Sequence, residues 1–120
     1  MKVAITSQGS DMQSRVDPRF GRARHFIVAD SDSGEFTCHD NEVNANAMQG
    51  AGIQAGRKVV ELGVVALITG HIGPNAFDTL QAGGVQVYSG ASGSVQEALA
   101  AFQAGDLQVV ETADVRGHWT

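Results

Sequence analysis

Three short runs near the N-terminus have the length and residue types of β-strands. They cover Lys2 to Thr6, His25 to Asp30 and Glu35 to His39. The turn segment Asp32 to Gly34 separates the second run from the third, and two strands joined by so short a turn form a hairpin. The sequence therefore predicts an antiparallel pair of strands near the start of the fold.

Helices and strands then alternate along the chain. Val64 to Ile68 contains no polar residue, as expected of a strand that is covered on both faces. The hydrophobic spacing predicts helices at Gly50 to Leu62, Pro74 to Ala82 and Val95 to Ala104, and a further strand at Val85 to Tyr88. The segment Gln103 to Val109 resembles Gln81 to Val87, so another helix end followed by a strand is expected there.

Two of the predicted helices begin at clear sequence signals. Pro74 suits the first position of a helix because its fixed φ is already helical. Ser94 and Glu97 match a capping box, in which each side chain accepts a hydrogen bond from a backbone N–H at the helix start. These two helix starts are therefore well defined by the sequence.

A hairpin followed by alternating helices and strands predicts the α/β class. The expected architecture is a mixed β-sheet, antiparallel hairpin strands first and parallel strands afterwards, with helices on its faces. Because crossovers are right-handed, the strand at Val64 to Ile68 should run parallel to the first strand. A crevice then opens where these two strands end, at Thr6 to Ser14 and Gly70 to Asn75.

Length and composition narrow the classes of function. We expect one domain at residues 1–113 of the 120, followed by a flexible C-terminal tail at residues 114–120. A formal net charge of −5 argues against a general nucleic-acid binder, and a single cysteine excludes an intrachain disulfide or a cage of thiolates around a metal. With no signal-peptide pattern and no apolar run of membrane-spanning length, we expect a cytoplasmic monomer without membrane contacts.

The sequence ITGHIGPNAF, at Ile68 to Phe77, joins a buried strand directly to a helix start. Glycine permits close backbone approach, and a helix N-terminus attracts anions through its N–H groups and its dipole. Two other predicted helix starts are also rich in small residues, at Gly50 to Gly52 and Gly90 to Ser94. Either these turns are only tight connections, or three positive helix ends share one rim that binds an anion.

Half of the eight Lys and Arg residues fall within ten positions of this acidic chain: Arg15, Arg19, Arg22 and Arg24. They form either a solvated loop paired with Asp11 and Asp17 or a segment that recognises anions. Phe20 and Gly21 have the pattern of the turn that enters the second strand, and Phe20 is expected to anchor the core rather than to act as a lid.

Few side chains are suited to bind a metal directly. Cys38 and His39 are neighbours on a strand and point to opposite faces, which favours ordinary strand roles. His71 follows the central strand and could touch copper or donate to sulfur, although a loop histidine without a ligand is the alternative. Met48 could offer a thioether, although packing is the more usual role of methionine.

Catalytic functions lack the residues they need. The strands Lys2 to Thr6 and Val64 to Ile68 carry no carboxylates for two-metal hydrolysis, and no G-x-S-x-G elbow occurs. We therefore expect no enzyme. A phosphate- or nucleotide-binding regulatory module stays open, because helix N-termini do not distinguish phosphate from other anions, although neither a P-loop nor a dinucleotide fingerprint is present.

Three segments together resemble the dinitrogenase iron–molybdenum cofactor biosynthesis family. They are VDPRFGRARHFIVAD at Val16 to Asp30, the stretch Met48 to Tyr88 with its GAG helix start and TGxxGPxA motif, and SVQEALAAFQAGDL at Ser94 to Leu107. The resemblance implies a ribonuclease-H-like mixed sheet and noncovalent carriage of an anionic metal–sulfur cluster without catalytic turnover. That cluster would be a molybdenum–copper sulfide, or alternatively an iron–molybdenum or iron–sulfur cluster. The resemblance also implies MinD-type ATPases as partners in some relatives.

The chemistry of such a ligand matches the residues singled out above. A thiometallate is a multiply charged anion with sulfur on its outside, so backbone N–H groups, helix N-termini, guanidinium groups and apolar contacts can hold it. The residues predicted to bind it are Arg15, Arg19, Phe20, Gly21, Arg22, Met48, Gly50, Ala51, Gly52, Gly70, His71, Ile72, Gly73, Pro74, Asn75, Gly90, Ala91, Ser92, Gly93 and Ser94.

Overall fold

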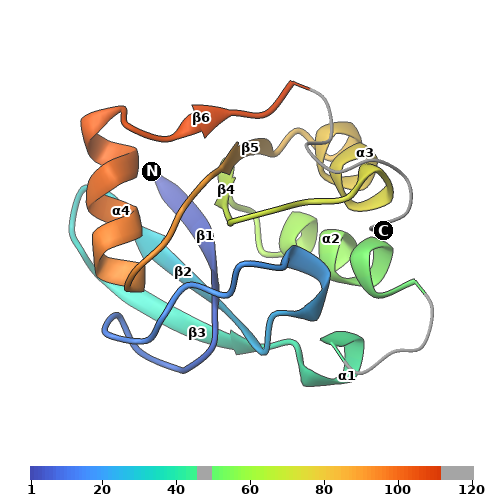
Figure 1. The fold of residues 1–120 in the computed structure, drawn as a ribbon, viewed down its shortest axis with the longest axis horizontal. Coiled ribbons are helices and arrows are strands. Elements are labelled where there is room, and N and C mark those ends of the chain that lie inside the picture. Colours follow the sequence, from blue (N-terminus) through green and yellow to red (C-terminus); the bar gives the residue numbers. More distant parts are fainter. Residues whose placement is uncertain (46–49, 112–120) are drawn as a thin grey trace.

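The computed structural model describes residues 1–45 and 50–111, and within these residues six strands form one mixed sheet (Figure 1). The strands are β1 (Lys2–Ser7), β2 (His25–Asp30), β3 (Phe36–Asp40), β4 (Ala66–Ile68), β5 (Gln86–Ser89) and β6 (Gln108–Val109). Their order across the sheet is β3-β2-β1-β4-β5-β6. Met48 and the tail predicted at residues 114–120 lie outside the described residues.

The strand pairing confirms the predicted α/β class. β1 pairs antiparallel with β2 and parallel with β4, while β2 pairs antiparallel with β3. β4 and β5 are parallel, and β6 joins β5 in the antiparallel sense. The hairpin therefore extends the sheet on one side of β1 and the helical units extend it on the other, which is a ribonuclease-H-like arrangement.

Three helices of at least two turns cover the described part of the sheet. α2 (Ala51–Glu61) and α3 (Pro74–Ala82) lie on one face, and α4 (Val95–Ala104) lies on the other (Figure 1). The predicted bounds of α3 and α4 are confirmed. A proline in the first turn of α3 and a capping box on α4 fix where these two helices start. In the described ranges, no helix is long and apolar enough to span a bilayer.

Some elements differ from the sequence-based prediction. The one-turn helix α1 (Glu42–Ala45) and the 3-10 turn η1 (Phe20–Arg22) were not predicted, because such short elements have no hydrophobic period. β3 and β5 each begin one residue later than expected. β4 is shorter than the apolar run that predicted it, and Val65 of that run is 49% exposed rather than covered on both faces.

The two faces of the sheet have separate hydrophobic cores. On the face covered by α2 and α3, Ala4 and Leu67 from the central strands pack with the aromatic ring of Phe26. On the α4 face, Ile5 and Ile68 pack with the residues of α4. Successive residues of β1 and β4 thus alternate between two buried faces, which explains why Val3 to Ile5 and Ala66 to Ile68 are all apolar.

Candidate functional site

Residues 15–22, the arginine segment, cross the carboxyl ends of β1, β4 and β5. Backbone hydrogen bonds join the segment to all three strand ends: Asp17 N–H to Thr6 O at 3.0 Å, His71 N–H to Pro18 O at 2.7 Å, and Val16 N–H to Gly93 O at 2.9 Å. The crevice predicted at this edge is therefore bridged by the chain itself. The segment is held as a fixed strap across the edge rather than as a free loop.

Arg19 and His71 are two predicted ligand-binding residues that the arginine segment brings together. They form an isolated parallel bridge, in which the N–H of Phe20 also donates to the carbonyl oxygen of His71 at 3.2 Å. Both residues are exposed at the surface. The structure thus brings a guanidinium-bearing residue and an imidazole-bearing residue to adjacent backbone positions.

The glycines of this region serve close packing of the chain on itself. A Cβ on Gly70 would lie 2.7 Å from the carbonyl oxygen of Pro18, and one on Gly21 would lie 3.0 Å from the backbone nitrogen of Gly52. The first contact packs the strap against the loop after β4, and the second packs η1 against the start of α2. The close approach predicted at Gly70 is therefore made by the backbone of the arginine segment.

The N-termini of α2 and α3 lie next to each other beside this segment. A Cβ on Gly52 would lie 3.3 Å from the Cβ of Ala76, so the first turns of the two helices are in contact. The residues preceding them, Gly50 and Gly73, make no side-chain cap, and neither first turn contains an acidic residue. The first N–H groups of a helix have no partner within it, and Pro74 has no N–H, so Asn75 and Ala76 supply the donors of α3.

The N-terminus of α4 is closed by protein groups. Ser94 Oγ accepts the N–H of Glu97 at 3.1 Å, and Glu97 Oε1 accepts the N–H of Ser94 at 3.0 Å. The two intervening amides, of Val95 and Gln96, donate to the carbonyl oxygens of Ser14 and Met12, each at 2.8 Å. The hydrogen bond from the Ser94 backbone lowers the pKa of Glu97, which favours a carboxylate at this helix end. Of the three helix starts expected to share a rim, those of α2 and α3 are therefore adjacent and receive no side-chain cap from Gly50 or Gly73, while that of α4 has a capping box.

Backbone groups of the loop before α4 also hydrogen-bond to other parts of the protein. The N–H of Gly90 donates to the carbonyl oxygen of Gly70 at 3.1 Å, and that of Ala91 donates to Thr69 at 3.2 Å. Gly93 accepts from the arginine segment, while Ser92 is exposed. This loop ties the ends of β4 and β5 together.

The arginines differ in their surroundings. Arg24 forms an ion pair with Glu42 at 3.5 Å, whereas Arg15, Arg19 and Arg22 have exposed side chains. Within residues 1–45 and 50–111, neither Arg15 nor Arg19 lies within ion-pair distance of a carboxylate. The pairing with Asp11 and Asp17 that a solvated loop would show is thus not made by these two arginines.

Several predicted site residues are buried and can offer a ligand only backbone groups. Phe20 is 2% exposed and packs its ring 5.6 Å from that of Phe26, which confirms its role as a core anchor. Ile72, Ala51 and Ala91 are also buried. The side chains that this edge exposes to solvent are therefore mainly those of its arginines, His71 and Asn75.

The candidate metal ligands are dispersed. Cys38 is exposed overall on the edge strand β3, and partial desolvation of its thiol, with the nearby charge of Asp40, raises the pKa of that thiol. His39 Nε2 lies 3.0 Å from the hydroxyl of Thr37, on the face of the strand opposite to Cys38, as predicted. In the part of the chain that the structure describes, no three His, Cys, Asp or Glu side chains are grouped so that they could hold a metal ion.

Three buried polar residues at this edge were not selected from the sequence. The hydroxyls of Thr6 and Thr69 are hydrogen-bonded at 3.0 Å, and Thr6 Oγ1 donates to the carbonyl oxygen of Asp17 at 2.8 Å. The signal was present, because the apolar runs of β1 and β4 both end in Ile-Thr. The third residue, Asp17, lies in the arginine segment, and burial raises the pKa of its carboxyl group.

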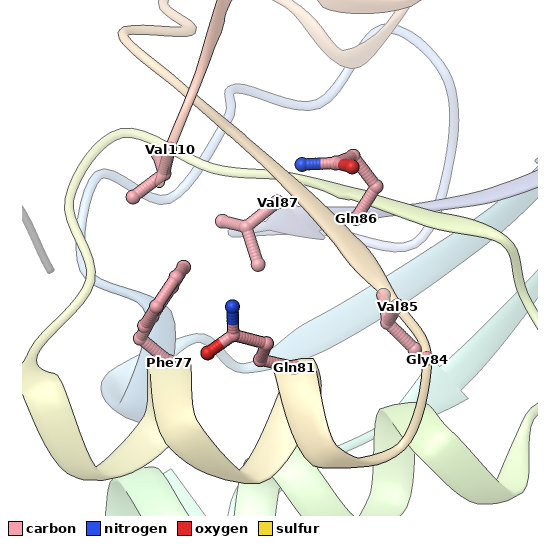
Figure 2. A pocket seen from close by; sticks show the side chains of 7 residues that line it. All are labelled: Phe77, Gln81, Gly84, Val85, Gln86, Val87 and Val110. Atoms are coloured by element: carbon pink, nitrogen blue, oxygen red, sulfur yellow. The ribbon is translucent and has the colours of Figure 1, made fainter. Parts of the chain in front are cut away.

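A separate hollow of about 230 Å³ lies between α3, β5 and the residue after β6 (Figure 2). Phe77 and Gln81 point into it from α3, facing Val87 and Val110. Its lining contains no charged residue and none of the predicted binding residues. The hollow is thus not the anion site expected at the carboxyl edge.

The chain belongs to the dinitrogenase iron-molybdenum cofactor family, whose sequence profile matches residues 1–105. The apo form of the orange protein from Desulfovibrio gigas has the same fold, with a TM-score of 0.92 and 33% identity over 95% of this chain and 96% of that one. A Thermotoga protein solved by NMR gives a TM-score of 0.82 and 42% identity, over 95% and 97% of the two chains. An uncharacterised protein of Methanocaldococcus jannaschii is 29% identical over 113 residues, 92% of each chain.

Proposed function

We propose that this protein is a non-catalytic carrier that binds an anionic metal–sulfur cluster noncovalently at the N-termini of α2 and α3 and the arginine segment. Family membership and the likeness to the orange protein support a cluster as the ligand. The observation that carries the location is the contrast between helix starts, since α2 and α3 are adjacent and receive no side-chain cap from Gly50 or Gly73, while the first amides of α4 are hydrogen-bonded to protein groups. The first turns of α2 and α3 are therefore the better place for an anion.

The proposed site holds the ligand by charge and hydrogen bonds. Each helix N-terminus favours an anion by roughly 0.3–1 kcal/mol when exposed and by up to about 2 kcal/mol when partly buried. Arg15, Arg19 and Arg22 add exposed guanidinium-bearing side chains along the arginine segment, and guanidinium groups form strong charge-assisted hydrogen bonds. His71, beside Arg19, is placed to donate to sulfur or to touch an outer copper ion.

We propose a molybdenum–copper sulfide cluster as the cargo, with an iron–molybdenum or iron–sulfur cluster as the alternative. The donors named above recognise the sulfide surface and the negative charge of a cluster. All three kinds of cluster have both properties. The choice among them therefore depends on metal analysis. Protein purified without oxygen and analysed for metals and sulfide should contain molybdenum and copper.

Titration with tetrathiomolybdate and copper(I) tests the proposal. The wild-type protein should bind them and develop a visible charge-transfer band, and the affinity should fall as salt rises because exposed charges are screened. Replacing Arg15, Arg19 and Arg22 together by Gln should weaken binding at low salt and flatten the salt dependence.

Cys38→Ser serves as the matched control, because Cys38 lies on the edge strand away from the arginine segment. This variant should bind as the wild type does. Loss of the band in Cys38→Ser would show thiolate ligation and contradict the noncovalent site. Binding of ATP or phosphate in place of the thiometallate, with no colour, would favour a nucleotide- or phosphate-binding module.

A further inference from the structure

Asp17 is a buried carboxylate inside a segment that is otherwise rich in arginine. The residue is 8% exposed, although its neighbours Pro18 and Arg19 are exposed. Its backbone is fixed twice by β1, since its N–H donates to Thr6 O at 3.0 Å and its carbonyl oxygen accepts the Thr6 hydroxyl at 2.8 Å. The position of this carboxylate is therefore set by the sheet.

The carboxylate acts on the backbone of Arg19. Asp17 Oδ1 accepts the N–H of Arg19 at 3.1 Å, which closes a tight turn over Pro18. In the same turn the carbonyl oxygen of Pro18 accepts the N–H of His71 at 2.7 Å. Asp17 thus stabilises the turn that sets Arg19 beside His71.

We infer that Asp17 is a positioning residue that holds Arg19 next to His71 at the proposed anion site, and that the negative charge of its carboxylate weakens the binding of anions there. This inference rests on the proposed function. The positioning uses an oxygen acceptor, which Asn also has, whereas the charge is particular to Asp. The two contributions of Asp17 can therefore be separated by substitution.

The surroundings of Asp17 disfavour the ionised form of its carboxyl group. Burial raises the pKa of the carboxyl group, and the hydrogen bond and charge of Arg19 offset this only in part. The other groups hydrogen-bonded to this stretch of backbone, the Thr6 hydroxyl and the His71 amide, carry no charge, and the imidazole of His71 is the remaining titratable group of the bridge. The charge of Arg19 still acts on the carboxylate of Asp17, although the two groups are not an ion pair. The poorly solvated negative charge of Asp17 therefore competes with an incoming anion for the positive charge of Arg19.

The test compares Asp17→Asn with Asp17→Ala, using tetrathiomolybdate as the probe. Asp17→Asn keeps the acceptor for Arg19 and removes the charge, so it should bind the probe about three- to tenfold more tightly at low salt. Asp17→Ala also loses the acceptor and should bind more weakly than Asp17→Asn. Asp11→Asn is the matched control, since Asp11 is an exposed carboxylate of the preceding loop that also accepts a backbone N–H, and it should change the affinity less.

Amide hydrogen exchange without any ligand supplies a second readout. The amides of Arg19 and His71 should exchange faster in Asp17→Ala and should keep wild-type protection in Asp17→Asn. Equal probe affinity in wild type and Asp17→Asn overturns the charge effect, and unchanged exchange in Asp17→Ala overturns the positioning role. If wild-type protein binds no probe, the proposed function fails and the charge effect fails with it, while the exchange data still decide the positioning role.

Discussion

The backbone N–H of His71 donates a 2.7 Å hydrogen bond to the carbonyl oxygen of Pro18, which joins the arginine segment to the loop that leads into α3. This bond brings together two features that are far apart in the sequence: a cluster of positive side chains and a helix N-terminus. The close contact is permitted because the neighbouring residue, Gly70, has no side chain.

Gly70→Ala should therefore destabilise the protein. The new methyl group would lie 2.7 Å from the carbonyl oxygen of Pro18, so the strap or the loop must shift, at a cost of about 1–3 kcal/mol. Urea unfolding measures this cost. Gly52→Ala is the control, because its methyl group would meet only the side chain of Ala76 at 3.3 Å and alanine favours a helix. Equal stability of both variants and the wild type would argue against a tight contact at Gly70.

Ser94→Ala should separate stability from ligand binding. Loss of the capping box on α4 should lower the free energy of unfolding by about 1 kcal/mol. The affinity for tetrathiomolybdate should not change, because the amides of Val95 and Gln96 still donate to the carbonyl oxygens of Ser14 and Met12 in this variant. Ser92→Ala, an exposed serine of the same loop, is expected to be neutral in both measurements. A clear loss of affinity in Ser94→Ala would place α4 in the binding site.

Asp17→Asn should change the pH dependence of stability. Because burial raises the pKa of Asp17 above its ordinary value of 3.8, the protonated form is favoured in the folded state. The stability that this carboxyl contributes is fully present below pH 3.8 and is lost as the pH rises through its raised folded pKa. Asn does not ionise, so Asp17→Asn keeps this stability as the pH rises. The free energy of unfolding of Asp17→Asn, relative to that of the wild type, should therefore be greater at pH 7 than near pH 3.8. Urea unfolding of both proteins across this range measures the difference, and an advantage that grows toward acid pH would contradict the assignment.

The sequence predicted most of the fold because its signals are local. The bounds of α3 and α4 follow from Pro74 and from the Ser94–Glu97 capping box. The uniformly apolar run ending at Ile68 indicated a strand between two covered faces, which is how β4 lies. The hairpin and the parallel pairing of β1 with β4 also follow from patterns within a few residues and from general rules of topology.

The candidate site was harder to predict because long-range contacts decide which donors remain available. The capping box already accounted for two amides of α4, but the acceptors of the other two are Met12 and Ser14, which no local pattern connects to this helix. Likewise, the sequence predicts that Gly70 allows a ligand to approach the backbone closely, whereas in the fold the backbone of Pro18 makes this close approach. The sequence thus pointed to the carboxyl edge of the sheet as the candidate site, and the structure separates α2 and α3 from α4 along that edge.

Amide NMR of the wild-type protein during titration with tetrathiomolybdate and copper(I) locates the bound anion residue by residue. Signals of the arginine segment at Arg19 to Arg22, of the first turn of α2 at Ala51 to Ile53, and of Asn75 and Ala76 at the start of α3 should shift or broaden together. Signals of the first turn of α4, Val95 to Glu97, and of the edge strand β3 should stay in place. Changes centred on α4 or on Cys38 and His39, with the starts of α2 and α3 unaffected, would contradict the proposed site.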